Sequence, residues 1–320
     1  MPVPPRRRRR ICAAFALTLL PITIIAASGR SASPSPQTEA LPAFKVANWN
    51  VRSGMGIMGK KPQINSNTVD CKENASKPGG PFWPAMDVLK NDAGVVALGI
   101  EEAWGCATPE AIRKYLGWQH TTGELNGTGL VTRYGLRGKH VSEKIAFKGV
   151  EGATEDQWLF GGDVCLDAGC GSTLRIYSAH YASRDQGGFA AQARNTIAYV
   201  KAQPSFERNI VLGDLNYYMA NRTLVPCGTT RTTSPPADLF AAAGYVDAWL
   251  KLKPGIDGAT GMWNRPGCGK PAGGLFKRID YIYSRGLSPT DVSLFAMIKP
   301  MEDDAPSDHA GIVATFGGKR

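Results

Sequence analysis

The segment NIVLGDLN, residues 209–216, is the part of this 320-residue chain from which the fold is most readily inferred. It begins with a short β-branched apolar run, which is typical of a buried strand. Two polar residues, Asp214 and Asn216, follow directly. Taken alone, an Asp-x-Asn sequence after a strand is more often a turn, because both side chains cap local backbone groups. Its meaning therefore depends on how the other strands end.

Other apolar segments end in the same manner, with an acid, an amide or a histidine at or just after the last apolar residue. Phe44 to Val51 carries Asn48-Trp49-Asn50, Val95 to Ile100 is followed by Glu101-Glu102, and Leu174 to Ala179 is followed by His180. Arg278-Ile279-Asp280-Tyr281 and Ser307-Asp308-His309 add two further polar groups. Polar residues at the ends of neighbouring strands converge on one edge of a sheet. We therefore expect one polar site at that edge.

Strands outnumber helices along the chain. Further strands are expected at Gly129 to Thr132, Trp158 to Leu166, Ile279 to Tyr283, Val292 to Met297 and Ile312 to Phe316. Helices are expected from Thr108-Pro109 to Gly117, from Ser234-Pro235 to Gly244, and over about Gly188 to Ala202. Because strands and helices do not alternate strictly, the pattern predicts an α/β sandwich with mixed sheets.

The order of the polar residues, Asn, Glu, His, Asp-x-Asn, Asp and Asp-His, resembles that of the endonuclease/exonuclease/phosphatase superfamily from Phe44 to Phe316. The Gly-Asp-Leu-Asn and Ser-Asp-His segments carry the resemblance, and GLVTRY at residues 129–134 is similar to the family's strand ending in Ser-Arg-Tyr-Pro. The resemblance implies a four-layer DNase I-like α/β sandwich, in which two packed mixed β-sheets are flanked by helices. It also implies a metal-dependent hydrolase that acts on phosphoester bonds.

The resemblance further implies a metal site. Glu102 would be the principal ligand, and Asn50 and Asp308 would help to place the ion and its waters. Oxygen ligands of this kind suit Mg²⁺ or Mn²⁺. The family's glutamate normally follows a glutamine, and here that neighbour is Glu101, so the ligand is Glu101 or Glu102. Strand alternation turns adjacent side chains to opposite faces, and the preceding apolar run aligns better with Glu102.

The remaining motif residues would act on the phosphate. His309 would lie beside the scissile phosphate with Asp280 fixing its ring, and His180 would donate to a phosphate oxygen. Asp214 would orient or deprotonate the attacking water, while Asn216 would hold the phosphate or that water. Each residue alone has an ordinary structural explanation, so the interpretation depends on the presence of all of them in this order.

The expected substrate is a nucleic acid. The sequence around Asp280 resembles that of nucleases and general phosphodiesterases, and an aromatic and basic group follows the Asp-x-Asn motif, namely Tyr217, Tyr218, Arg222 and Arg231. Such residues can hold a strand by stacking and charge, although an ordinary solvated loop explains them equally well. The alternatives are a sphingomyelinase-like or inositol-phosphate-type phosphodiesterase or phosphatase and, less favoured, a non-catalytic binding module. The protein is expected to be a monomer.

The N-terminus predicts export. Arg6 to Arg10 precede an apolar stretch from Ile11 to Ala27, so residues 1–30 are expected to be a signal peptide of the Sec or twin-arginine type. A membrane anchor is the alternative, but the stretch is short and contains Pro21. Residues 31–42 would be a disordered spacer and residues 43–320 one domain. The mature protein would be secreted to the extracellular space, with no stable membrane insertion.

The cysteines and the charge agree with this expectation. Six cysteines follow the signal, and an even number suits disulfides better than a zinc site. Cys165 and Cys170 are expected to close a hairpin, leaving Cys71 with Cys106 and Cys227 with Cys268 among the possible pairings. The formal net charge is +10, but residues 1–30 carry six arginines and no acid. The 31 basic and 27 acidic residues that remain give +4, which does not discriminate among phosphorylated substrates.

Overall fold

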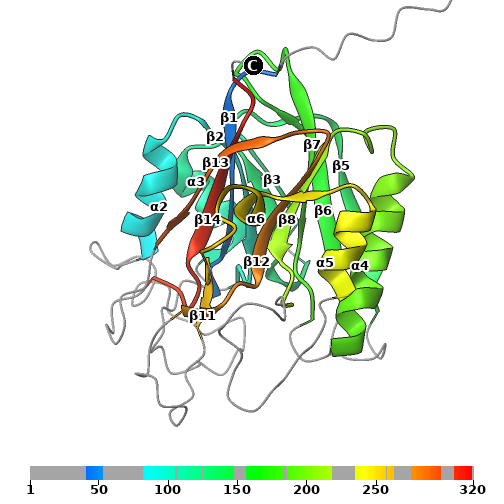
Figure 1. Cartoon of the computed structure of the whole chain (residues 1–320). Helices are drawn as coiled ribbons and strands as arrows, with labels where there is room; N and C mark the ends of the chain where they lie inside the picture. Colours follow the sequence, from blue (N-terminus) through cyan, green and yellow to red (C-terminus); the bar gives the residue numbers. More distant parts are fainter. Residues whose placement is uncertain are drawn as a thin grey trace, which may run out of the picture. The chain divides into compact units, whose positions relative to one another are not determined.

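The computed structural model describes residues 41–52, 82–104, 107–123, 125–147, 156–182, 186–217, 235–256, 258–262, 275–296 and 306–318. All of them belong to one compact unit, Ala40–Arg320. Two six-stranded sheets form the centre of this unit (Figure 1).

The first sheet has the strand order β13-β14-β1-β2-β4-β3. Its strands are β1 (Phe44–Asn50), β2 (Val95–Glu101), β3 (His120–Gly123), β4 (Gly129–Thr132), β13 (Pro289–Phe295) and β14 (Gly311–Phe316). Strand β1 pairs in parallel with β2, and the other neighbours are antiparallel. The sheet is therefore mixed, as the sequence predicted.

The second sheet has the order β5-β6-β7-β8-β12-β9. Its strands are β5 (Leu136–Ala146), β6 (Gln157–Cys165), β7 (Thr173–Ala179), β8 (Asn209–Asp214), β9 (Val246–Asp247) and β12 (Asp280–Arg285). Again one central pair, β7 and β8, is parallel and the other neighbours are antiparallel. Two short strands, β10 (Gly261–Met262) and β11 (Leu275–Lys277), pair separately.

Helices cover the outer face of each sheet. Helices α2 (Phe82–Asn91) and α3 (Pro109–Leu116) bury Met86 and Ile112 against the first sheet, in one cluster with Trp49 and Leu98. Helices α4 (Gln186–Lys201) and α5 (Pro235–Ala242) cover the second sheet through a separate cluster (Figure 1). A short helix, α6 (Ala248–Leu252), and a 3₁₀ turn, η3 (Leu125–Gly127), complete the described elements. The predicted four-layer α/β sandwich is confirmed.

The central layer of the sandwich is a third apolar cluster, which joins the two sheets face to face. It contains Val46, Leu130 and Ile312 from the first sheet, with Ile176 and Leu212 from the second. All five are fully shielded from solvent. Full burial of one such side chain contributes about 1.5–3 kcal/mol, so this layer fixes how the two sheets sit against each other.

The helix-end signals in the sequence operate as expected. The Thr108 hydroxyl accepts a hydrogen bond from the Ala111 amide at 3.2 Å, and Pro109 occupies the first turn of α3. Gly117 ends this helix in the left-handed conformation, with φ of 71°. Helix α5 likewise begins at Pro235 and is followed by Gly244 with φ of 80°.

The short disulfide is also confirmed. Cys165, at the end of β6, is bonded to Cys170 in the turn before β7, with a Cα–Cα distance of 4.7 Å. Asp167 closes this turn by accepting hydrogen bonds from the amides of Gly171 and Ser172. The other four expected cysteines, Cys71, Cys106, Cys227 and Cys268, lie outside the described residues, as does the expected signal peptide. Among the described helices, none is long and apolar enough to cross a bilayer.

Strand β5 was not expected. Its sequence, LRGKHVSEKIA, is polar because β5 lies at the edge of its sheet and exposes most of its first half. Charged side chains are common on edge strands, where they oppose pairing with another chain. The strand pattern of the sequence, which relied on apolar runs, does not detect a strand of this kind.

Candidate active site

The directions of the strands bring the motif residues to one edge. Strands β1, β2, β7 and β8 end there, because β1 is parallel to β2 and β7 is parallel to β8. Strands β12 and β14 begin there, since each runs antiparallel to its central neighbour. Asp280 is the first residue of β12 and pairs with Asp214, the last residue of β8. His309 lies two residues before β14.

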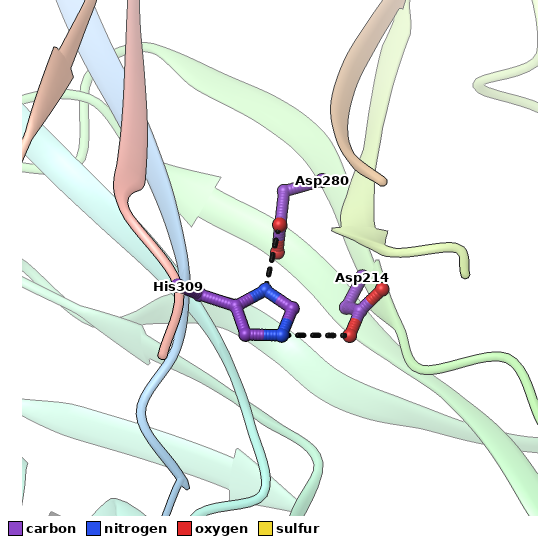
Figure 2. A group of neighbouring side chains, drawn as sticks. All are labelled: Asp214, Asp280 and His309. Atoms are coloured by element: carbon purple, nitrogen blue, oxygen red, sulfur yellow. Dashed lines mark hydrogen bonds and ion pairs between the residues drawn. The ribbon is translucent and has the colours of Figure 1, made fainter. Parts of the chain in front are cut away.

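Three buried side chains form the centre of the site (Figure 2). Nδ1 of His309 makes a hydrogen bond to Oδ2 of Asp280 at 2.9 Å, and Nε2 of His309 lies 3.9 Å from Oδ2 of Asp214. One side-chain atom from each of the three residues lies within 4.8 Å of the others. The imidazole therefore lies between two carboxylates. Its Nδ1 is hydrogen-bonded to Asp280, and its Nε2 lies close to Asp214.

The backbone around His309 is held in place by the first strand. The indole of Trp49 donates to the carbonyl of His309 at 3.0 Å, and the Ser307 hydroxyl donates to the carbonyl of Asn50 at 2.7 Å. The same hydroxyl accepts from the His309 amide at 3.2 Å. These contacts fix the backbone around His309 to β1, while Asp280 of β12 holds the ring itself.

The charges of this group shift each other's protonation. Burial, reinforced by the neighbouring Asp280, raises the pKa of Asp214 to about 6, although His309 and His180 act in the opposite direction. Burial alone lowers the pKa of His309, but the Asp280 and Asp214 carboxylates outweigh it and raise that pKa well above the usual range. Near neutral pH, His309 therefore retains a proton while Asp214 is close to its titration point.

Asp214 is held by two further contacts. Its Oδ1 accepts from the amide of Asn216 at 3.0 Å, and its Oδ2 accepts from Nδ2 of Asn50 at 2.9 Å. Nε2 of His180 lies 3.6 Å from the same Oδ2 and has no hydrogen-bond partner among the described residues. The side chain of Asn216 donates to the carbonyl of Tyr181 at 2.8 Å. Asn50, His180, Asp214 and Asn216 thus meet as the sequence predicted.

Of the residues expected to hold a metal, Asn50 donates from one amide nitrogen to both Glu102 and Asp214, and Asp308 lies near Arg52. Oε1 of Glu102 accepts from Nδ2 of Asn50 at 3.1 Å. The Asp308 carboxylate lies 3.6 Å from Nε of Arg52. Partial burial, reinforced by the charge of Glu102, raises the pKa of Asp308, although the charges of His309 and Arg52 act in the opposite direction. Two carboxylates and an amide are the oxygen donors that Mg²⁺ and Mn²⁺ prefer, so the donor set fits such an ion.

The two adjacent glutamates, Glu101 and Glu102, point in different directions. The cause is the end of strand β2 and not the alternation of side chains along a strand. Strand β2 ends at Glu101, and Glu102 turns away with a φ of 51°. Glu101 is fully buried between the sheets, where its carboxylate accepts from Nδ2 of Asn48 at 3.1 Å and from the Ser178 hydroxyl at 3.3 Å. Burial and the charges of Asp280 and Asp214 raise the pKa of Glu101 well above its usual range. Both glutamates therefore reach the site, Glu101 beneath it and Glu102 beside Asn50.

The prediction that Tyr217 contacts substrate is wrong. Its ring is 2 % exposed and stacks on Tyr281 at 4.6 Å, and its hydroxyl shares a 2.6 Å hydrogen bond with that of Tyr283. After Asp214 the chain stays in the core: Leu215 is fully buried, and its amide donates to the carbonyl of Ile279. The other residues expected to bind substrate, Tyr218, Arg222 and Arg231, lie outside the described residues.

Thr260 supports the site and was missed in the sequence. Its hydroxyl accepts hydrogen bonds from the amides of Ile279 and Asp280 at 3.2 and 3.1 Å, and its carbonyl accepts from the Ala310 amide at 2.7 Å. It therefore fixes the backbone on both sides of the Asp280–His309 pair. Thr260 lies in a polar segment without apolar periodicity, so no signal in the sequence distinguishes it.

Comparisons with known proteins agree with this geometry. A family model described as the Endonuclease/Exonuclease/phosphatase family matches residues 47–309. No curated protein sequence matches the chain.

Solved structures with the same fold include an endonuclease/exonuclease/phosphatase from Beutenbergia cavernae, with a TM-score of 0.58, 16% identity, and coverage of 86% of this chain and 71% of that one. TDP2 from D. rerio, complexed with a single-strand DNA product, gives a TM-score of 0.59, 16% identity, and coverage of 86% and 99%. A protein of the same description from Bacteroides vulgatus gives 0.59, 15% identity, and coverage of 87% and 100%.

Proposed function

The chain belongs to the endonuclease/exonuclease/phosphatase family, and from this membership we propose that it is a secreted, divalent-metal-dependent phosphodiesterase that cleaves nucleic acid. Enzymes of this family are metal-dependent phosphoester hydrolases, and this chain is one of them. The observation that carries the proposal is the buried Asp214–His309–Asp280 group next to Asn50 and Glu102. This arrangement supports a mechanism in which Asp214 is the base, His309 is the acid and Glu102 is a metal ligand.

Glu102, with Asn50 and Asp308, would hold Mg²⁺ or Mn²⁺. When bound, the ion supplies positive charge that neutralises the phosphate oxygens as the phosphoester is cleaved. The side chains of the protein then have two tasks, to activate water and to orient the phosphate. Both depend on groups that are already positioned by hydrogen bonds to the backbone or to each other.

Asp214 acts on the attacking water. A pKa of about 6 leaves most of this carboxylate ionised at neutral pH while keeping it basic enough to accept a proton. The hydrogen bonds from the Asn216 amide and from Asn50 fix its orientation. Water placed against Asp214 would therefore be oriented, and then deprotonated, as it attacks phosphorus.

The two histidines act on the phosphate oxygens. His309 donates from Nδ1 to Asp280, which leaves its protonated Nε2 as a donor toward the phosphate. Nε2 of His180 faces the same region and lacks a partner among the described residues, so a phosphate oxygen would satisfy a buried polar atom. No covalent intermediate is required, because Asp214 activates water directly.

The proposed nucleic-acid substrate is supported by a solved structure with the same fold. The D. rerio TDP2 structure contains a single-strand DNA product, and this precedent on the same fold supports the proposal. Arg278 does not add to it, because its guanidinium is buried in an ion pair with Asp247 at 2.8 Å. The net charge of +4 after residues 1–30 predicts modest affinity and a shallow dependence on salt.

Export and a monomeric state are part of the same proposal. Arg6 to Arg10, followed by the apolar stretch from Ile11 to Ala27, support a signal peptide. The Cys165–Cys170 disulfide supports an oxidising compartment. N-terminal sequencing of protein recovered from the culture medium tests export, and retention of the full N-terminus inside the cell would contradict it.

A substrate panel tests the activity. Protein without residues 1–30 is incubated with Mg²⁺ and plasmid DNA, single-stranded DNA, RNA, sphingomyelin or inositol polyphosphate, and Asp214→Asn serves as the matched blank. We expect cleavage of at least one nucleic acid and none by the blank. Turnover of the lipid or the inositol substrate while every nucleic acid stays intact would show that the substrate assignment is wrong and would leave the family assignment in place.

A further inference from the structure

A row of cross-strand neighbours extends from the active site along the inner face of the second sheet. Asp280 pairs with Asp214, and the register of β7 with β8, extended by two residues, brings His180 next to Asp214, in agreement with their 3.6 Å contact. Leu159 pairs with Ala179, so the next position along places Trp158 opposite His180. Lys144 in turn pairs with Trp158. Neighbouring strands lie about 4.8 Å apart, so Trp158 is the first side chain beyond the catalytic group.

Trp158 faces the same way as the catalytic residues. Its ring stacks at 6.2 Å on that of Phe160, and Phe160 lies against Gly123 of the first sheet, which shows that both rings face the first sheet. Phe160 is buried, whereas Trp158, nearer to the active-site edge, is only partly buried. Trp158 therefore lies at the active-site end of β6, opposite His180, and is partly accessible to solvent.

A lysine and a second aromatic ring complete this patch, which we call the aromatic shelf and define as Lys144, Phe147 and Trp158. Nζ of Lys144 lies 5.3 Å from the Trp158 ring and 5.7 Å from the Phe147 ring, and an ion pair with Asp156 at 2.6 Å holds it there. Phe147 is 52 % exposed, one of the most exposed large apolar side chains among the described residues. The shelf therefore offers aromatic area to a ligand, and Trp158 connects it to His180 through the register of β6 with β7.

We propose that the aromatic shelf is the subsite that holds the nucleobase next to the scissile phosphate. This inference rests on the proposed function and specifies its substrate as a strand whose bases are accessible, as in single-stranded nucleic acid. His180 would hold the phosphate, and the base on one neighbouring sugar would lie against Trp158 and Phe147. Stacking of a base on an aromatic side chain is tolerant of sequence, because every base has a π-face.

The composition of the shelf favours a base over the alkyl chain of a lipid. Lys144 contacts both rings and is ion-paired with Asp156, and an alkyl chain over this ion pair would remove its water without replacing the lost hydrogen bonds, which is unfavourable. A nucleobase offers carbonyl and ring-nitrogen acceptors together with its π-face, so it satisfies the lysine and the rings at once. A base paired inside a duplex presents only its edges in the grooves, so the shelf predicts a preference for unpaired strands.

Three dinucleotide substrates test the subsite: a complete dinucleotide and two analogues that lack either the 5′ or the 3′ base. For the unmodified protein, we expect loss of one particular base to lower kcat/KM by roughly tenfold. Trp158→Ala should lower kcat/KM for the complete dinucleotide by a similar factor and leave the analogue without that base unchanged. Trp158→Phe should retain most of the activity, and Phe147→Ala, an exposed position, should reproduce part of the loss. Val88→Ala is the matched control, because Val88 is 55 % exposed on helix α2, outside the first sheet.

The outcomes separate the two proposals. If Trp158→Ala and Phe147→Ala lower the activity on all three substrates equally, or on none, the subsite is wrong while nucleic-acid cleavage stands. If the unmodified protein cleaves none of the three but hydrolyses sphingomyelin, the proposed substrate is wrong and the subsite falls with it. A base-dependent loss in both variants, with Val88→Ala unchanged, supports the subsite.

Discussion

Replacing Asp214 by Asn is expected to stabilise the metal-free protein at alkaline pH while it removes the activity. Asp214 is 1 % exposed, and its pKa is raised from 3.8 to about 6. Each pKa unit corresponds to about 1.4 kcal/mol, so keeping this carboxylate ionised in the folded protein costs about 3 kcal/mol of stability. Asparagine has nearly the same shape and no charge, so it avoids this penalty.

The substitution also has a cost. Both oxygens of Asp214 accept hydrogen bonds, one from the Asn216 amide and one from Asn50, and an asparagine has only one oxygen to offer. Loss of one such bond destabilises by about 1 kcal/mol. The net expectation at pH 8 is therefore that the variant is more stable by about 2 kcal/mol.

The sign of the effect depends on pH. Because the folded-state pKa of Asp214 is raised, its stabilising contribution is fully present below about pH 3.8 and is lost as the pH rises through about 6. The unmodified protein should therefore lose stability relative to Asp214→Asn across this range. At pH 4 the variant should be equal or slightly less stable, and at pH 8 clearly more stable.

Urea unfolding in the presence of a chelator, at intervals from pH 4 to pH 8, measures this difference. Asp291→Asn is the control, because Asp291 is an exposed acid on β13 and its replacement should change stability by less than about 0.5 kcal/mol at either pH. A difference between Asp214→Asn and the unmodified protein that does not change with pH would refute the reasoning. It would mean that the folded protein holds Asp214 ionised without penalty.

Three further predictions follow from the same structure. His309→Asn, whose amide nitrogen can take the place of Nδ1 and keep a hydrogen bond to Asp280, should lower kcat by ~100-fold or more with little change in the thermal midpoint, and unfolding instead would indicate a structural role. A chelator should abolish hydrolysis and added Mg²⁺ or Mn²⁺ should restore it, so full activity in excess EDTA would contradict the proposed metal ligands. Joint replacement of Cys165 and Cys170 by Ala should lower the free energy of unfolding by about 2 kcal/mol in urea titrations, and a change below 0.5 kcal/mol would show that this short loop constrains the unfolded chain little.

The fold was accessible to the sequence because its central strands are short apolar runs with polar ends. Segments such as Val95 to Ile100 and Asn209 to Leu212 are buried along their whole length, so their composition alone indicates strands. The polar endings then indicate which strand ends lie together. Burying a carboxylate such as Asp214 or Asp280 without a partner is unfavourable, so residues of this kind are expected to lie near one another. The edge strand β5 gave no such signal, because it needs no apolar run to pair on one side.

The errors at the site have specific causes. Tyr217 and Tyr218 look alike in the sequence, but Tyr217 is buried, with its ring stacked on Tyr281 and its hydroxyl bonded to that of Tyr283. The alternation rule for Glu101 and Glu102 assumes a continuing strand, whereas the backbone leaves strand geometry at Glu102. Trp158 had no signal of its own, because its position opposite His180 depends on the register of β6 with β7.

The proposed active site depends on close contact between the two sheets, because its residues come from both. Asn50, Glu102 and His309 are attached to the first sheet, whereas His180, Asp214 and Asp280 belong to the second. Gly99 permits this contact: a Cβ atom there would overlap the Leu212 side chain and lie 2.6 Å from Oδ1 of Asn48 and 3.0 Å from the Ser178 hydroxyl. The same two side chains, Asn48 and Ser178, donate to Glu101 directly beneath the catalytic group. The spacing of the sheets and the position of the catalytic side chains are therefore set at the same place, since any residue larger than glycine at position 99 would separate His309 from Asp214 as it separated the strands.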